Sequence, residues 1–293
     1  MHLTDFHGAD IRVPADRFVY SADPGVAHDA DLVLVAVKSA ATAEAGAALA
    51  AVLKPGAITV SFQNGLHNAE VLAGAMPGKT VVAGMVEFNV INRGGGVFHQ
   101  GSEGSVDAAQ HAGLAPFVPL FEKAGLPLTQ HADFPRVQWA KLQLNLNNAV
   151  NALAGIPLKE ELGQRAFRRC IALAQRELLD ALDVAGIALP KLTPLPAKWL
   201  PRSLDVPDFL FRASAKSVLA IDPLARSSMW EDLQAGRTTE VDFLNGEVVA
   251  LAARHGTRAP VNARLVALIR DAEHGGKRNW RGDELLAELK RAG

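Results

Sequence analysis

Short apolar runs separated by an alanine-rich helical stretch dominate the first part of the chain. Residues 31–37 and 57–62 are nearly continuous apolar segments rich in β-branched residues, which is typical of strands buried on both faces of a parallel sheet. Between them, residues 40–53 have helical character and end at Lys54-Pro55-Gly56. The pattern therefore predicts a β-α-β unit.

The same alternation continues beyond this unit. Asn64-Gly65 marks a turn, residues 68–75 are expected to form a helix, and residues 80–89 are expected to form another strand. Two shorter segments bounded by turns, 95–100 and 127–131, look like the closing strands of this sheet. Their register and direction are not specified by the sequence.

After Pro135 the periodicity becomes helical. Helices are predicted over 137–154, 164–186, 207–220, 239–255, 261–274 and 282–291. Prolines between residues 190 and 207 indicate a connection inside this helical part rather than a further domain boundary. The predicted fold class is therefore α/β followed by all-α, with domains at 1–134 and 135–293.

Composition narrows the class of protein. A chain of 293 residues with 49% hydrophobic and 21% charged residues is ordinary for two globular domains. The balance of 30 basic and 31 acidic residues argues against a nucleic-acid partner. A single cysteine, Cys170, excludes an intrachain disulfide and fits the cytoplasm, and no signal peptide or membrane span is predicted.

The first group of candidate site residues lies on one expected helix. Lys141, Asn145 and Asn148 share a face of the segment that begins at Trp139, among leucines at 142, 144 and 146. An ammonium can donate a proton to a carbonyl oxygen while amides bind the other oxygens of a substrate. A solvated polar face is the alternative interpretation of these three residues.

The second group lies about a hundred residues downstream. It comprises Ser227-Ser228-Met229, Arg237-Thr238-Thr239-Glu240 and Leu244-Asn245-Gly246. Thr239 and Asp242 also have the spacing of a capping box, which would put Glu240 in the first turn of a helix. Glu231 and Asp232 are equally consistent with solvated surface charges.

Order and spacing of these segments resemble the ketopantoate reductase family, whose members reduce 2-dehydropantoate or related 2-oxo acids with NADPH. Val35-Ala36-Val37-Lys38 and Gln63-Asn64-Gly65 extend the resemblance into the first half. The resemblance implies a Rossmann-type sheet domain and a helical domain of the 6-phosphogluconate dehydrogenase C-terminal type. Taken alone, Asn64-Gly65 is an ordinary turn and Lys38 a solvated charge at a strand end.

Carried over residue by residue, the resemblance makes Lys141 the proton donor to the substrate carbonyl. Asn145 and Ser228 would bind the substrate. The cofactor, NADP, would be lined by Lys38, Asn64, Val90 and Glu240. Where the family pattern has its next asparagine four residues after Asn145, this chain has Ala149. Asn148 is chosen for the second substrate asparagine on helical geometry, and Asn147 and Asn151 are alternatives.

The glycine-rich phosphate loop, Gly-x-Gly-x-x-Gly, occurs nowhere in the 293 residues. Residues 1–13 resemble the segment that follows the second strand of the family fold, so at least one β-α-β unit of roughly 30 residues is expected upstream. A chain starting here is expected to expose a strand edge and to be unstable or sticky. An incorrect start site is favoured over a truncated remnant or completion by another polypeptide.

Two further interpretations differ from reduction of 2-dehydropantoate. One is a paralogue that reduces another 2-oxo acid, with Trp199, Phe211 or Trp230 setting the choice, although large apolar residues are more often core. The other is a non-catalytic remnant that kept the helical domain. That domain is also the candidate surface for a homodimer.

Overall fold

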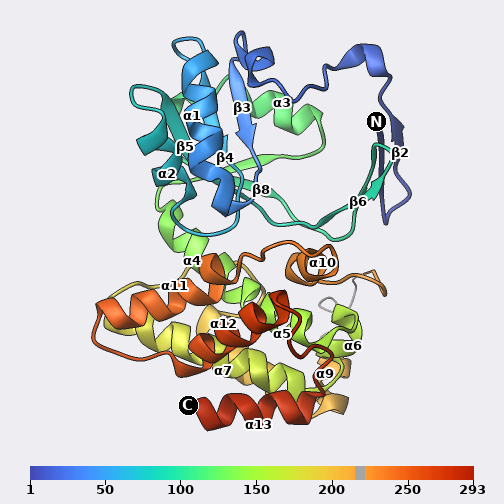
Figure 1. Ribbon diagram of the computed structural model, residues 1–293, viewed down its shortest axis with the longest axis vertical. Coiled ribbons are helices and arrows are strands. Elements are labelled where there is room, and N and C mark those ends of the chain that lie inside the picture. The colour runs from blue at the N-terminus through green and yellow to red at the C-terminus, as the bar shows by residue number, and fades with distance from the viewer. Residues whose placement is uncertain (215–221) are drawn as a thin grey trace. The chain divides into compact units, whose positions relative to one another are not determined.

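The computed structural model describes residues 1–214 and 222–293, which form two compact units, Met1–Pro135 and Arg136–Gly293 (Figure 1). The first unit contains all of the β-strands of the described chain, and helices make up the second. The units divide one residue after the boundary expected from the sequence. Residues 215–220 of the predicted helix 207–220 lie outside the described residues.

A five-stranded sheet forms the centre of the first unit. Its strands lie in the order β3-β4-β5-β8-β9, and their bounds are Leu32–Val35, Ile58–Ser61, Thr80–Val86, Val106–Ala109 and Leu128–His131. β3, β4 and β5 run parallel, β8 is antiparallel to β5, and β9 is parallel to β8. Helices α1 (Thr42–Val52) and α2 (Asn68–Ala75) make the two crossovers. The predicted β-α-β succession is confirmed, although β5 ends at Val86 rather than at residue 89.

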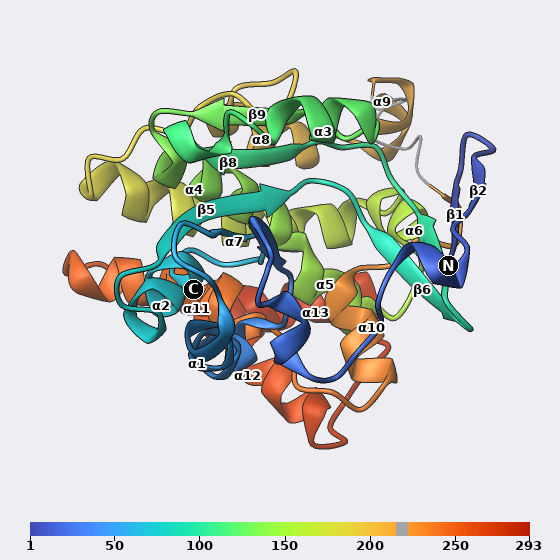
Figure 2. The same ribbon diagram turned by 90° about the horizontal axis from the view of Figure 1, so that it is seen from above.

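Each face of this sheet has its own core, because successive strand residues point to opposite faces. Val60 and Val82 belong to a cluster that packs against Phe117 and Phe121, beside and within α3 (Val118–Lys123). On the other face, Val35 packs with residues of α1 and α2, among them Leu72, which is fully buried. Figure 2 shows α3 on one side of β5 and α1 and α2 on the other. β3 is the last strand at one side of the described sheet, and its Leu34 is 49% exposed.

A second, four-stranded sheet of the first unit was not predicted. It has the order β2-β1-β7-β6, with bounds Asp10–Arg12, His2–Asp5, Val97–Gln100 and Val90–Gly94. The prediction that residues 95–100 close the large sheet was therefore wrong. β7 instead pairs with β6 across a tight glycine turn and lies parallel to β1, which comes from the start of the chain. Figure 2 shows the four-stranded sheet at a distance from β5 and β8 of the five-stranded sheet.

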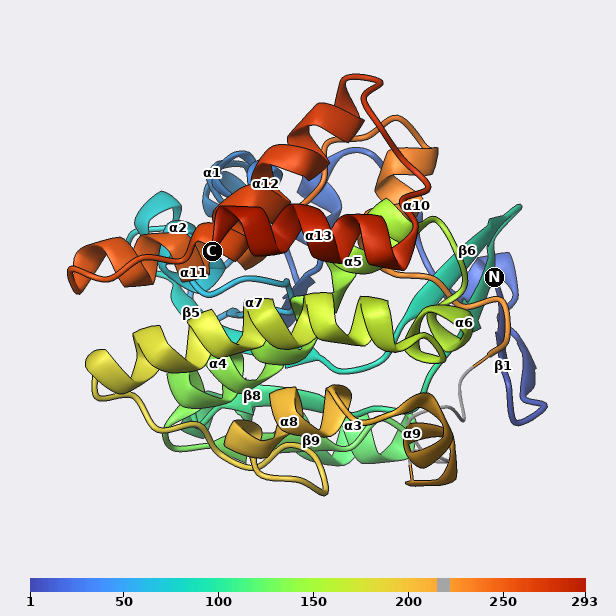
Figure 3. The same cartoon turned by 90° about the horizontal axis from the view of Figure 1, so that it is seen from below.

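Helices are the regular elements of the described part of the second unit. Their bounds are α4 Phe134–Asn145, α5 Asn147–Ala154, α6 Leu158–Leu162, α7 Arg165–Val184, α8 Leu200–Leu204, α9 Asp208–Ser214, α10 Ser228–Gln234, α11 Val241–Arg254, α12 Pro260–Glu273 and α13 Gly282–Ala292. The predicted helix 137–154 is divided at Leu146 into α4 and α5. Figure 3 shows the long α7 with α13 beside it, and α7 buries an apolar stripe that includes Phe167, Ile171 and Leu178. No helix within the described residues is both long and apolar enough to span a membrane.

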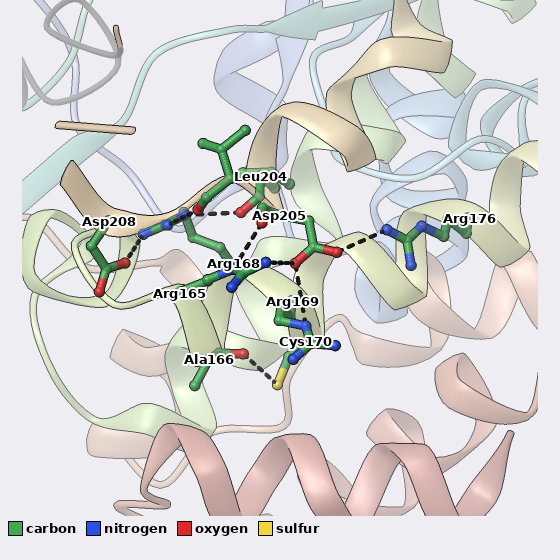
Figure 4. A network of polar contacts seen from close by, with 10 residues as sticks. Arg165, Ala166, Arg168, Arg169, Cys170, Arg176, Leu204, Asp205 and Asp208 are labelled. Atoms are coloured by element: carbon green, nitrogen blue, oxygen red, sulfur yellow. Dashed lines mark hydrogen bonds and ion pairs between the residues drawn. The ribbon is translucent and has the colours of Figure 1, made fainter. Parts of the chain in front are cut away.

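A buried arginine fastens the segment before α9 to α7 (Figure 4). Arg168 has no exposed surface, and its guanidinium donates to the carbonyl oxygens of Leu204, Leu162 and Val206 at 3.0, 2.8 and 2.7 Å. It also pairs with Asp208 at 2.9 Å and lies 4.2 Å from the ring centre of Phe211. Burial lowers the pKa of Arg168, and the ion pair with Asp208 opposes that shift. A buried cation is tolerated here because carbonyls and a carboxylate surround it.

Candidate active site

Lys38 and Asn64 follow the carboxyl ends of two neighbouring parallel strands. Val35 at the end of β3 is paired in register with Ser61 at the end of β4, so the loops that carry the two residues begin side by side. Lys38 is exposed and precedes a short 3-10 helix, and Asn64 is half-buried before Gly65, whose φ is +91°. In open α/β sheets, ligands bind in the crevice outside such strand ends.

A group of buried polar side chains, the strand-end network, joins these two loops. Its members are Ser39, Thr42, Ser61, Gln63 and Asn68, each at most 6% exposed. The Gln63 amide donates to the carbonyl oxygen of Val37 at 3.0 Å and to the hydroxyl of Thr42 at 2.7 Å, and its oxygen accepts from Ser61 at 2.8 Å. Gln63 therefore ties the end of β4 to the residue before Lys38.

Asn68, the first residue of α2, completes the strand-end network. Its amide nitrogen donates to the Ser39 hydroxyl at 3.1 Å and also to the backbone carbonyl of Asn64, and its oxygen accepts from Thr42 at 2.8 Å. Ser39 donates to the same Asn64 carbonyl at 3.1 Å. Sequence reasoning missed these partners, although the four-residue spacing of Lys38 to Thr42 and of Asn64 to Asn68 was visible.

Val90 is placed differently from Lys38 and Asn64. It begins β6 in the four-stranded sheet, opposite Gln100, and it is 49% exposed. It is not a member of the strand-end network, so its expected role toward the cofactor stays a prediction.

Lys141 and Asn145 lie one turn apart on α4, and both are half-buried. Gln143 lies between them and is buried, and its side chain donates to the Ala197 carbonyl at 2.9 Å. Leu142 is buried as well. Lys141 and Asn145 therefore form a polar stripe on α4 next to the helix face that packs in the core. An ammonium and an amide on one stripe can donate to two oxygens of a single small molecule.

The three asparagines after Asn145 have different environments. Asn151 is fully buried, and its amide donates to Glu161 at 2.8 Å and to the Ile156 carbonyl at 3.0 Å while its oxygen accepts from the backbone of Ser227 at 2.8 Å. Asn147 contacts Glu161 at 3.5 Å. Asn148 is half-buried, and its side chain makes no hydrogen bond within the described residues.

The start of α10 is fastened to α5 beside Asn148. The Ser227 hydroxyl donates to the Asn148 carbonyl at 3.1 Å and accepts from the backbone of Trp230 at 3.2 Å, as the N-cap of α10. Ser228, the first residue of α10, is half-buried. The helical unit thus brings together two of the expected substrate residues, Asn148 and Ser228.

Glu161, which was not a candidate in the sequence, has no exposed surface. Burial raises the pKa of its carboxyl to about 8, and the hydrogen bonds from Asn151 and Asn147 lower it only in part. No cation pairs with it within the described residues. The carboxyl is therefore a neutral acid at neutral pH and supports Asn151, which holds Ser227.

Glu240 is 7% exposed and is the N-cap residue of α11, without a side-chain cap bond. The capping-box interpretation of Thr239 and Asp242 is wrong. Asp242 pairs instead with Arg270 at 2.7 Å, and the Thr239 hydroxyl accepts from Val241 at 3.3 Å.

Another charge that the sequence left as a surface candidate is also buried. Asp232 is only 1% exposed and pairs with Arg237 at 3.1 Å. A solvated role is therefore excluded for Asp232.

The three large apolar residues that were expected to set substrate choice differ in burial. Phe211 is buried under Arg168, so it belongs to the core, and Trp199 is 47% exposed. Trp230 is half-buried with Arg226 stacked 4.2 Å from its ring centre.

Burial raises the pKa of Cys170 to about 12, which argues against a nucleophilic role for that thiol. The described residues contain no cluster of three or more His, Cys, Asp or Glu suited to a metal ion.

Two sequence families cover most of the chain. The family described as ketopantoate reductase PanE/ApbA matches residues 2–113, and its C-terminal counterpart matches residues 133–273. The 2-dehydropantoate 2-reductase of Halobacterium salinarum is 30% identical over 266 residues, which are 87% of this chain and 80% of that protein.

Solved structures agree in fold. The PanE/ApbA family ketopantoate reductase from Ralstonia eutropha JMP134 matches with a TM-score of 0.78 at 26% identity, over 94% of this chain and 85% of that one. A D-mandelate dehydrogenase, solved with NADH and anilino(oxo)acetate, matches with a TM-score of 0.74 over 94% and 85% of the chains. Its identity of 16% makes that a likeness of fold alone.

The fold, a Rossmann-like sheet unit followed by a helical unit, together with the matched family and relative, defines the class, a two-domain nicotinamide-dependent oxidoreductase. Within that class the chain belongs to the ketopantoate reductase family. The predicted fold class and family resemblance are thereby confirmed.

Proposed function

We propose that the protein reduces 2-dehydropantoate to pantoate with NADPH, a step that supplies pantothenate biosynthesis. The observation that carries this proposal is that Lys141 and Asn145 lie one turn apart on the same side of α4, in a chain of the ketopantoate reductase family. Reduction of a 2-oxo acid needs a proton donor to the carbonyl oxygen and a group that binds another oxygen of the substrate, and Lys141 and Asn145 are of these two kinds.

The bound nicotinamide would supply the hydride that adds to the substrate's carbonyl carbon. Lys141 would donate a proton from its ammonium to the carbonyl oxygen as the C–H bond forms, so that a 2-hydroxy acid results. The neutral amine is then reprotonated from solvent. A donor aimed at the oxygen stabilises the charge that develops there as the carbonyl is reduced.

Substrate orientation is assigned to the other polar residues of the helical unit. Asn145 would donate to a substrate oxygen one helical turn from Lys141. Asn148 and Ser228 would bind the carboxylate and hydroxyl oxygens of the substrate, since the Asn148 amide makes no hydrogen bond within the described residues and Ser227 bonds to the Asn148 carbonyl. Glu240, the buried N-cap of α11, is assigned to the nicotinamide ribose.

The dinucleotide is assigned to the carboxyl ends of β3 and β4 in the sheet unit. The Lys38 ammonium follows one strand and the Asn64 amide follows the other, and the buried strand-end network fixes the backbone beside both. A lysine serves as a point charge toward phosphate oxygens, and an amide can bond to a ribose or a carboxamide. The backbone at Val90 is the third element proposed to line the cofactor.

Steady-state kinetics of the protein test this assignment. NADPH consumption is measured with 2-dehydropantoate, with an aromatic 2-oxo acid such as benzoylformate, and with NADH in place of NADPH. The proposal predicts the highest kcat/KM for the pair 2-dehydropantoate and NADPH. A higher value with another 2-oxo acid would identify a paralogous reductase, and NADPH binding without any turnover would identify a non-catalytic relative.

We also infer a homodimer formed through the helical unit and a cytoplasmic location. A structure of a Staphylococcus aureus relative is described as a dimeric ketopantoate reductase, with a TM-score of 0.64 at 15% identity. The one cysteine, buried and free, is compatible with a reducing compartment. Sedimentation velocity tests the dimer, and a monomer at micromolar concentration would contradict it. Cell fractionation tests the location.

A further inference from the structure

The strand-end network has a definite direction of hydrogen bonding. Both amide hydrogens of Gln63 are used, on the Val37 carbonyl and the Thr42 hydroxyl, and its oxygen accepts from Ser61. A reversed amide would turn the Gln63 oxygen toward the Val37 carbonyl oxygen and lose both donors. Only one orientation of Gln63 satisfies all of its neighbours.

Asn68 is fixed for the same reason. Its amide nitrogen faces two acceptors, the Ser39 hydroxyl and the Asn64 carbonyl, and its oxygen faces the Thr42 hydroxyl. The Asn64 carbonyl thus receives two donors, from Asn68 and Ser39, which uses both of its lone pairs. The backbone at Asn64 is held from two sides.

Thr42 is the junction of the two halves. Its hydroxyl accepts from Gln63 at 2.7 Å and shares its one proton between the Ser39 carbonyl and the Asn68 oxygen, both at 2.8 Å. Thr42 has no exposed surface, so water cannot replace these partners without opening the core. Removing this hydroxyl leaves a Gln63 hydrogen and the Asn68 oxygen without a partner.

We propose that Thr42, through Gln63 and Asn68, is a positioning residue that presets the loops of Lys38 and Asn64 for the dinucleotide. The inference rests on the proposed function. A loop that is already held in its binding conformation does not lose that freedom when the ligand binds, so preorganisation increases affinity without adding a contact. Thr42 itself bonds within the fold and need not touch the ligand.

The chain offers a matched control for this idea. Thr59 on β4 is also fully buried, and its hydroxyl makes no hydrogen bond within the described residues. Thr42→Val and Thr59→Val therefore remove the same atom from two buried sites of one sheet unit, and only the first breaks the strand-end network. Thr42→Ser keeps the hydroxyl and serves as the rescue variant.

The measurement is the Kd for NADPH, by fluorescence titration of the protein without substrate, together with kcat at saturating NADPH. Thr42→Val is expected to raise Kd about tenfold, the change that corresponds to one hydrogen-bonded junction, and to leave kcat within about twofold. Thr59→Val and Thr42→Ser are expected to keep Kd within about threefold of the wild type. A Kd for Thr42→Val equal to that of Thr59→Val overturns the proposal.

If Thr42→Val does not fold, Ser61→Ala replaces it, because Ser61 supports only the Gln63 oxygen. An increase in Kd of about threefold is then expected, and an unchanged Kd overturns the proposal. Failure of the proposed function gives a different result, since the wild-type protein itself then shows no NADPH binding or no turnover.

Discussion

Replacing the buried acid Glu161 by glutamine should stabilise the helical unit, and increasingly so as the pH rises. Glu161 has no exposed surface and no cationic partner within the described residues, and burial raises its pKa from 4.5 to about 8. Glutamine has the shape of the protonated acid but cannot ionise. The variant therefore isolates the contribution of one proton.

Proton linkage determines how the stability of the wild type changes with pH. The native carboxyl holds its proton up to about pH 8, whereas the unfolded carboxyl releases it near pH 4.5. The stability contributed by the protonated form is therefore fully present below pH 4.5 and is lost as the pH rises through about 8. At 1.36 kcal/mol per pKa unit, the difference between the native and unfolded pKa of Glu161 lowers the free energy of unfolding by at most about 5 kcal/mol. About 3 kcal/mol of this loss has occurred at pH 7.

Urea unfolding followed by tryptophan fluorescence measures this effect. All four tryptophans, Trp139, Trp199, Trp230 and Trp280, lie in the helical unit and report on its unfolding. Glu161→Gln should match the wild type within about 1 kcal/mol near pH 5 and exceed it by about 3 kcal/mol near pH 7. The control is Glu160→Gln at the exposed neighbouring residue. A stability difference that stays constant from pH 5 to pH 8 would refute a protonated Glu161.

Two matched pairs of substitutions, one pair in each unit, test the packing by thermal or urea unfolding. Arg168→Met should destabilise the helical unit by about 3 kcal/mol because three carbonyls lose their donor, whereas Arg176→Met, at a side chain that is 45% exposed, should change it by less than about 1 kcal/mol. Gly46→Ala should destabilise the sheet unit by about 1–3 kcal/mol, since the new Cβ would meet that of Ala75 at 2.7 Å. Gly74→Ala has no atom within 4 Å of its new Cβ and should be neutral or slightly stabilising. Equal effects within either pair would contradict the packing described.

The parallel part of the fold was predictable because its chemistry is local. Parallel strands covered by helices have nearly continuous apolar runs, and residues 31–37 and 57–62 provide them. Of the two strands, β4 is buried along its whole length, whereas β3 is the last strand on one side of the described sheet and its Leu34 is 49% exposed, so the expected burial of β3 on both faces was wrong. The four-stranded sheet was not predictable in the same way. β7 is short and partly exposed, and its partner β1 lies about a hundred residues away in the chain, so no local pattern specifies the pairing.

In the candidate site, too, local spacing was predictable and contacts between distant residues were not. The shared face of Lys141 and Asn145 follows from helical spacing, whereas the choice among the later asparagines depends on the break at Leu146 and on Glu161 and Ser227, which the sequence alone does not bring together. Gln63 illustrates the limit. Its side chain bonds to the Val37 carbonyl, and no composition or periodicity identifies that partner.

Reduction of 2-dehydropantoate by NADPH in the wild-type protein and in Lys141→Ala tests the central proposal most directly. Lys159→Ala, at an exposed lysine of α6, is the matched control. The account predicts a fall in kcat of about 10²- to 10⁴-fold for Lys141→Ala, with the Kd for NADPH unchanged and Lys159→Ala like the wild type. Wild-type turnover in Lys141→Ala would contradict it.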